Sequence, residues 1–250
     1  MFEDLKQEQQ AEQAANQEKL AAQKAVCAEM KEILANEKDL SSQHGRVLGL
    51  RDSWKSIEQP DRKLLSNFQD MLEKFEAHEA KAQQKQLDAR NDRLWVKSAL
   101  LHELAVSGRT SNGSLSKKTE KKVKDEWPES GGAGAFETQL DKASEKLLAG
   151  EAISQSSEDE TALLADARLL AIRLEFLAGQ ESPAEDKAMR MQYQVDRLAQ
   201  SMSGDAARQS AEEEARDAEK SWLGMYKLPD QEYKSYGSRI KKALKSISKV

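Results

Sequence analysis

The stretch LRDSW at residues 50–54 has two relatives further along the chain, VKDEW at residues 123–127 and AEKSW at residues 218–222. Trp127 follows Trp54 by 73 residues. A short pattern that recurs at wide spacing is typical of repeat proteins, in which each unit buries its apolar face against its neighbours. The pattern therefore predicts an array of about three units, of which the terminal ones are partial.

The composition favours helices. Among 250 residues there are only 4 Pro and 12 Gly, and the abundant Ala, Glu, Lys, Gln and Leu lose little on entering a helix. Apolar residues make up 38% and aromatic residues 5% of the chain, which is a thin supply for one large compact core. We therefore predict an all-α fold, an elongated and coiled-coil-like helical-repeat array.

Helix breakers divide the chain into predicted segments. Gly45, Pro60 and Gly108 mark the first stops, and polar stretches mark the later ones. The segments are an N-terminal helix at 1–40 that ends a preceding unit, a first repeat unit at 46–108, a basic loop at 109–122, a second repeat unit at 123–180, connecting helices at 181–217, and a partial third unit with a basic C-terminal helix at 218–250.

The first predicted helix carries a narrow apolar seam. Leu20, Cys27, Met30 and Leu34 recur at spacings of seven, three and four, which suits packing on one partner helix. We expect this seam to fold back on residues 161–177 or to form a homodimer with a second copy.

A later helix is predicted to begin at Pro183, because proline is favoured at the first helical position. Its apolar face is expected to consist of Met189, Tyr193, Leu198 and Met202.

The first unit also resembles a known family. A charged dipeptide before Trp54, the Pro-Asp-Arg sequence at residues 60–62, Phe68, Phe75 and the segment 97–104 resemble the bacterial helical repeats catalogued as domain of unknown function 349. Three such units, two of them partial, would span most of the chain, and the first is the clearest match. This resemblance implies repeated α-helical units in long bacterial proteins. It implies no activity, cofactor or catalytic residue.

The cysteine and histidines form no pattern typical of a metal or catalytic site. His44, His78 and His102 include no HExxH arrangement, so we expect surface histidines and no metal or cofactor. Cys27 lies on the apolar seam, where a thiol behaves as a small buried hydrophobe rather than a nucleophile. We therefore predict that the chain is not an enzyme.

Other motifs have structural interpretations. The acidic runs 158–160 and 212–214 point to different faces of a helix, which favours solvated surface over a cation site. The glycine-rich stretch 130–134 lacks the GxxxxGK[ST] pattern and is interpreted as a linker. The recurring tryptophans are expected to pack short helices on long ones.

Two basic segments are the best functional signal in the sequence. They are Arg109, Lys117, Lys118, Lys121, Lys122 and Lys124, followed by Lys234, Arg239, Lys241, Lys242, Lys245 and Lys249. Such residues neutralise phosphates in nucleic-acid interfaces. The formal net charge of -5 favours instead solvation or pairing with acidic stretches of the same chain.

Together these features predict a non-enzymatic helical scaffold that binds one or more protein partners. The alternative is nucleic-acid or ribonucleoprotein binding through the basic loop 109–124 and the basic C-terminal helix. A single cysteine and the lack of a signal-peptide pattern favour the cytoplasm. No apolar run approaches the roughly 20 residues that cross a bilayer, so no membrane span is expected.

Overall fold

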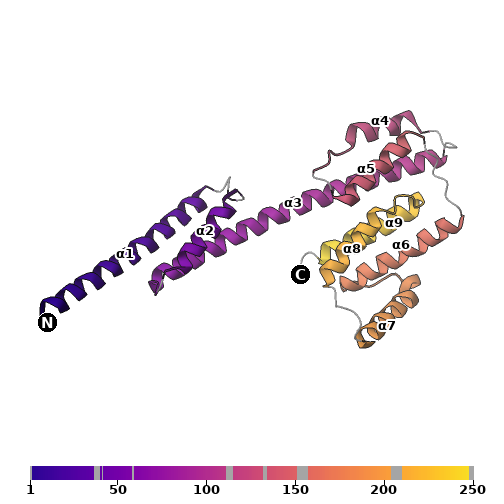
Figure 1. Cartoon of the computed structure of the whole chain (residues 1–250). Helices are drawn as coiled ribbons and strands as arrows, with labels where there is room; N and C mark the ends of the chain where they lie inside the picture. Colours follow the sequence, from indigo (N-terminus) through magenta and orange to yellow (C-terminus); the bar gives the residue numbers. More distant parts are fainter. Residues whose placement is uncertain are drawn as a thin grey trace. The chain divides into compact units, whose positions relative to one another are not determined.

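The structure is a computed structural model that describes residues 2–36, 40, 42–57, 59–110, 115–131, 134–150, 157–203 and 210–247. Over these residues it is all-α, as predicted, and contains no strand (Figure 1). Its helices are α1 (Phe2–Ala35), α2 (His44–Lys55), α3 (Arg62–Thr110), α4 (Lys117–Glu126), α5 (Ala135–Leu148), α6 (Ser157–Leu177), the 3-10 turn η2 (Ala184–Asp186), α7 (Lys187–Ser203), α8 (Ala211–Leu223) and α9 (Asp230–Ile247).

The chain divides into two compact units. Unit one is Met1–Ala89 and unit two is Arg90–Val250, so α3 contributes to both. Each unit has its own buried core. The predicted segment boundaries and the number of repeat units stay predictions.

Unit one buries the seam of α1 within the same unit. Cys27, Met30 and Ile33 are buried together with residues of α2 and the first part of α3. The Trp54 ring stacks on Phe68, with ring centroids 4.5 Å apart. The expected packing of this seam on residues 161–177 is therefore wrong for Cys27 and Met30, which α2 and α3 cover, whereas Leu20 at the other end of the seam is 37% exposed.

The start of α3 is capped by a local side chain. The Asp61 carboxylate accepts hydrogen bonds from the backbone N–H groups of Lys63 and Leu64, at 2.9 and 3.1 Å, which is the N-cap arrangement. Pro60 precedes this cap, where its missing N–H costs nothing. Gly45, in contrast, does not stop a helix but lies in the first turn of α2, and α3 continues past Gly108 to Thr110.

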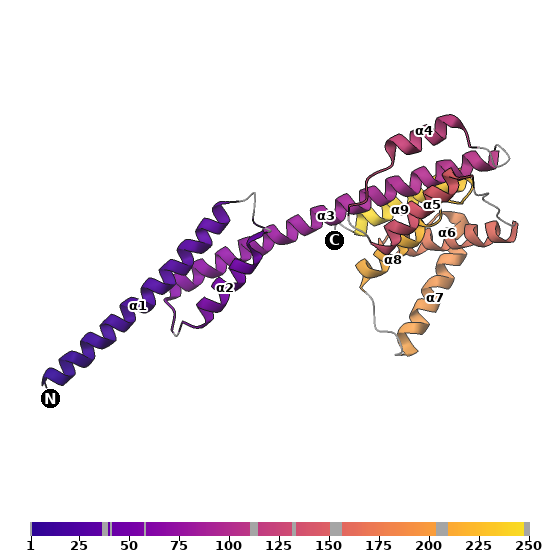
Figure 2. The same cartoon turned by 45° about the horizontal axis from the view of Figure 1, so that its top comes forward.

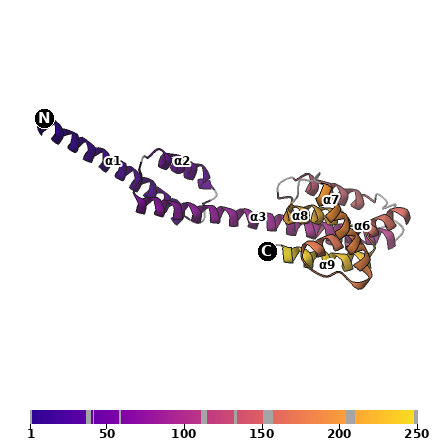
Figure 3. The ribbon, with the colours of Figure 1, turned by 90° about the horizontal axis from the view of Figure 1, so that it is seen from below.

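Unit two packs its helices around a single core. Leu101 and Leu104 of α3 are buried with residues of α5, α6, α8 and α9, among them Leu140 and Leu174. Helix α6 packs against α7, α8 and α9, and Figure 3 shows these four helices together in this unit. From α6, Ala167, Leu170 and Leu174 are buried in this core at spacings of three and four.

Two of the recurring tryptophans have the predicted packing role. Trp54 lies near the end of α2 and Trp222 near the end of α8, and both side chains are buried. Trp222 stacks near Tyr233 of α9, with centroids 5.1 Å apart. Trp127, which directly follows α4, is only half-buried, and its indole N–H donates to Asp141 at 3.0 Å.

Candidate interaction surface

The first basic segment lies mainly on a helix. Residues 109–122 were predicted to form a loop, but Arg109 belongs to α3 and Lys117–Glu126 form α4. A buried Val123 anchors α4 in the core and explains why this lysine-rich stretch is ordered. The loop prediction is therefore wrong for the described part of this segment; residues 111–114 lie outside it.

The lysines of α4 differ in their surroundings. Lys122 forms an ion pair with Glu103 at 2.6 Å, and Lys124 forms one with Glu120 at 2.6 Å. The side chains of Lys117, Lys118 and Lys121 are exposed, and no described residue forms a salt bridge with them. These three lysines form the accessible basic face of α4.

The second basic segment is partly internal. Arg239 binds both carboxylate oxygens of Glu175, at 2.7 and 2.9 Å, and also contacts Asp186 at 2.6 Å. Arg168 contacts the other oxygen of Asp186 at 2.5 Å. Glu175 and Asp186 are buried. Arg239 therefore holds α9 and η2 against α6 and is not available to a phosphate.

The remaining predicted contact residues are dispersed. The Lys241 ammonium lies 4.6 Å from the centre of the Trp95 ring, and Arg109 donates to the backbone carbonyl of Lys227. Lys242 and Lys245 are exposed on α9, and Lys249 lies outside the described residues. In Figures 1 and 2, α3 lies between α4 and α9. The two basic segments thus do not merge into one surface.

Helix α7 attaches to unit two through polar side chains. The Tyr193 hydroxyl donates to Glu214 of α8 at 2.8 Å, and Arg197 and Arg173 contact the same carboxylate at 2.7 and 3.1 Å. Burial opposes ionisation of Glu214, but these hydrogen bonds and charges outweigh it and lower its pKa. Glu214 of α8 therefore links α6 and α7 from a buried position. The prediction of solvated surface at residues 212–214 is wrong for this side chain.

The outer side of α7 is apolar. Met191, Val195, Leu198 and Met202, which we call the α7 stripe, are 67%, 57%, 64% and 81% exposed. The predicted apolar face is therefore only partly right: Leu198 and Met202 belong to the exposed stripe, whereas Met189 and Tyr193 are half-buried. The helix is rotated so that its Arg197 and Tyr193 reach Glu214, which leaves the large apolar side chains in solvent. Figures 1 and 2 show α7 at the edge of unit two, beyond α6.

The spacing of the stripe residues is visible in the sequence, although the apolar face predicted for this helix contained only Leu198 and Met202 of them. Its residues recur at spacings of four, three and four, which is the heptad pattern of a helix–helix seam. A surface of this kind is unusual, because exposed apolar side chains on soluble proteins are normally scattered singly.

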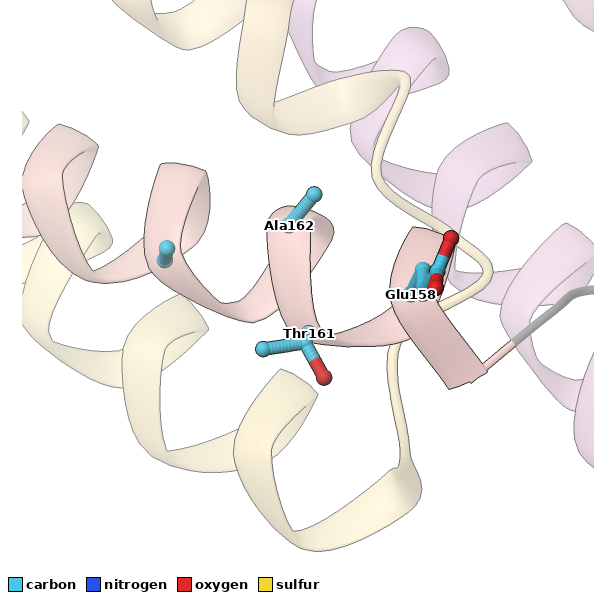
Figure 4. A pocket seen from close by; sticks show the side chains of 4 residues that line it. Glu158, Thr161 and Ala162 are labelled. Carbon is cyan, nitrogen blue, oxygen red and sulfur yellow. The ribbon is translucent and has the colours of Figure 1, made fainter.

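A pocket lies along α6. It has a volume of about 460 Å³ and is lined by Glu158, Thr161, Ala162 and Ala165 of that helix (Figure 4). The lining offers one carboxylate and one hydroxyl among small side chains. In the described ranges, no three His, Cys, Asp or Glu side chains lie together as a metal site would require.

The histidines and the cysteine occupy structural positions. His44 is exposed and contacts Glu79 at 2.9 Å. His102 is buried, contrary to the predicted surface position: its ring stacks on Tyr233 at 3.8 Å, and its Nδ1 lies 2.9 Å from the Tyr226 carbonyl oxygen, to which it donates. Cys27 is buried as predicted, and burial raises the pKa of its thiol.

One buried lysine was not predicted from the sequence to have a structural role. Lys97 of α3 has 0% of its side chain exposed and donates to Glu137 and Asp141 of α5, at 2.9 and 2.7 Å. Burial opposes ionisation of Asp141, but hydrogen bonds from Lys97, Ser130 and Trp127 lower its pKa. This cluster ties the stretch after α4 and α5 to α3, so the predicted glycine-rich linker is held at Ser130 by side-chain contacts.

The carboxyl group of Glu219 is expected to make the stability of the fold depend on pH. Burial raises the pKa of Glu219, although the Trp95 indole N–H donates to it at 2.6 Å. A group whose pKa is higher in the folded state than in the unfolded state stabilises the fold at pH values below its unfolded-state pKa. This stabilisation is lost as the pH rises through its folded-state pKa. Glu219→Gln is therefore expected to raise the melting temperature at pH 7 more than at pH 4. Thermal melts at both pH values check this, with the exposed Glu129→Gln as control, and an equal shift at both pH values would contradict it.

No described helix is both long enough and apolar enough to cross a membrane. Over its described residues the protein is all-α. Its surface consists of exposed helix faces and clusters of ion pairs.

One family model matches the N-terminal part of this chain. The model described as Domain of Unknown Function (DUF349) matches residues 1–63, which comprise α1, α2 and the start of α3. The resemblance to this family is thereby confirmed over that segment. Comparisons with curated proteins and with solved structures give no match.

Proposed function

We propose that this chain is a non-enzymatic helical module that binds protein partners and serves as a scaffold in the bacterial cytoplasm. The observation that carries the proposal is the α7 stripe, because four large apolar side chains on one exposed helix face are typical of a protein interface. The chain has a single cysteine, which is buried and free, and the lack of any pair of cysteines for a disulfide supports the cytoplasm as the compartment.

A second candidate is nucleic-acid binding through α4. The exposed Lys117, Lys118 and Lys121 support it, since they follow one another along a short helix and no described residue forms a salt bridge with them. The pairing of Arg239, Lys122 and Lys124 with carboxylates reduces the basic surface that the sequence predicted.

Capture of partners from a bacterial lysate separates the two candidates. The tagged full chain, Leu198→Glu and the triple variant Lys117→Glu/Lys118→Glu/Lys121→Glu are each used with and without nuclease. We expect a protein partner that survives nuclease, is retained by the triple variant and is lost with Leu198→Glu. Untagged copies of the chain are supplied in the lysate, so that self-association counts as a captured partner.

The matched control is Leu48→Glu, which places the same charge at a leucine of α2 that is 45% exposed. It should retain the partner. A partner that is indifferent to Leu198→Glu would contradict the proposal, and one that vanishes with nuclease and with the triple variant would establish the alternative.

A further inference from the structure

Helix α7 lies in the connection from α6 to α8, which is much longer than the connections that precede α2 and α4. Residues 36–43 join α1 to the tryptophan helix α2, and residues 111–116 join α3 to α4, which Trp127 follows. The corresponding connection before Trp222, from α6 to α8, runs over residues 178–210 and contains η2 and α7. The insertion adds an apolar surface without adding a residue of α7 to the buried core of unit two.

The α7 stripe has the register of a coiled-coil seam. Val195 and Met202 fall at heptad positions a, and Met191 and Leu198 fall at positions d. A β-branched residue at a followed by leucine at d favours pairing of two helices. The central pair of the stripe, Val195 and Leu198, has this arrangement.

The flanks of the stripe are compatible with an identical helix. The residues at the neighbouring e and g positions are Gln192, Gln194, Ala199 and Ser201, all uncharged, and the first three are exposed. The only charged residue at such a position is Lys187, at the start of the helix. Two copies of α7 can therefore lie side by side without like charges facing each other along the seam.

The charged residues of α7 argue against a lipid surface as the occupant. Helices that lie in a membrane interface present Lys and Arg beside their apolar face. In α7, Arg197 contacts Glu214, and Arg190 donates to the Ser182 hydroxyl at 3.0 Å. These cations are held against unit two, so the face around the stripe lacks the basic rim that an anionic membrane would attract.

We propose that the α7 stripe binds the α7 stripe of a second copy of this chain. The proposal rests on the proposed function, because it names the occupant of the same surface. The polar contacts to Glu214 fix α7 before association, so no helix has to fold on binding. A four-residue stripe buries a small area, which corresponds to a weak dimer with a dissociation constant on the order of 10–100 μM.

Sedimentation equilibrium of the purified full chain at loading concentrations from below to above this range tests the proposal. We expect the mass to rise from monomer to dimer, and Leu198→Glu to weaken association by at least about tenfold, because it places two carboxylates at one position d. Leu48→Glu should dimerise as the unmodified chain does. Circular dichroism of each variant verifies that the exposed substitution leaves the helices intact.

The other outcomes are distinct. A chain that stays monomeric at all concentrations overturns the dimer, and so does a dimer that persists in Leu198→Glu. If a different protein is still captured through Leu198 while the chain is monomeric, the dimer fails and the proposed function stands. If the chain is monomeric and captures nothing through Leu198, both fail. Flotation of the monomer with vesicles of anionic lipid, lost in Leu198→Glu, would assign the stripe to a membrane instead.

Discussion

Replacing Lys97 by methionine is expected to lower the free energy of unfolding of unit two by about 3–5 kcal/mol. The side chain is fully buried, and Glu137 beside it is 1% exposed. Removal of the ammonium leaves the Glu137 carboxylate buried with only Arg93, 3.9 Å away, as a counter-charge. Urea unfolding followed by far-ultraviolet circular dichroism measures the loss.

Two further variants define the cause of that loss. Lys118→Met removes an exposed lysine from α4 and should change stability by less than about 0.5 kcal/mol. The double variant Lys97→Met/Glu137→Met should recover part of the stability, because apolar replacement of a buried ion pair leaves no uncompensated charge. A double variant less stable than Lys97→Met would show that the charge pair itself contributes the stability.

The second large effect is expected from Trp222→Ala. The side chain is 0% exposed, and its ring packs near Tyr233 and against Gly237, where an added Cβ would lie only 3.0 Å from the indole. Truncation leaves a large cavity where α8 meets α9 and should cost about 3–5 kcal/mol. Differential scanning calorimetry of the full chain measures this change.

Trp127→Ala is the comparison variant, because Trp127 carries a related sequence pattern but is only half-buried. Its cost should be smaller, consisting of lost partial burial and the hydrogen bond to Asp141. Equal losses for the two tryptophans would contradict the assignment of Trp222 as a core residue and Trp127 as a surface-anchored one.

The sequence predicted those parts of the fold that depend on local pattern. The Asp61 cap follows from a short-range preference, and the burial of Trp54 and Trp222 follows from the large apolar area of the indole. The capping box of α8, formed by Ser210 and Glu213, is an equally local feature, although the predicted segment boundaries at 181–217 and 218–250 do not coincide with it. Residues 204–209 lie outside the described part of the chain.

The side-chain clusters could not be predicted, because their partners are distant in sequence. Lys97 and Glu137 are brought together only when α5 packs on α3. The exposed α7 stripe escaped prediction for a related reason. Periodicity analysis assumes that the apolar side of a helix faces inward. Here a buried Glu214 on another helix draws the polar side inward, and no local pattern in α7 signals that carboxylate.

The division of α3 between two cores has a consequence for cooperativity. Phe75 is the last residue of α3 in the core of unit one, and Leu94 is the first in the core of unit two. The turns between them contribute no residue to either core. Backbone hydrogen bonds and helix propensity hold them, together with ion pairs near their ends, Glu79 with His44 and Arg93 with Glu137. Loss of one core therefore does not remove the contacts that stabilise the other, and the chain should unfold in two steps rather than in a single all-or-none transition.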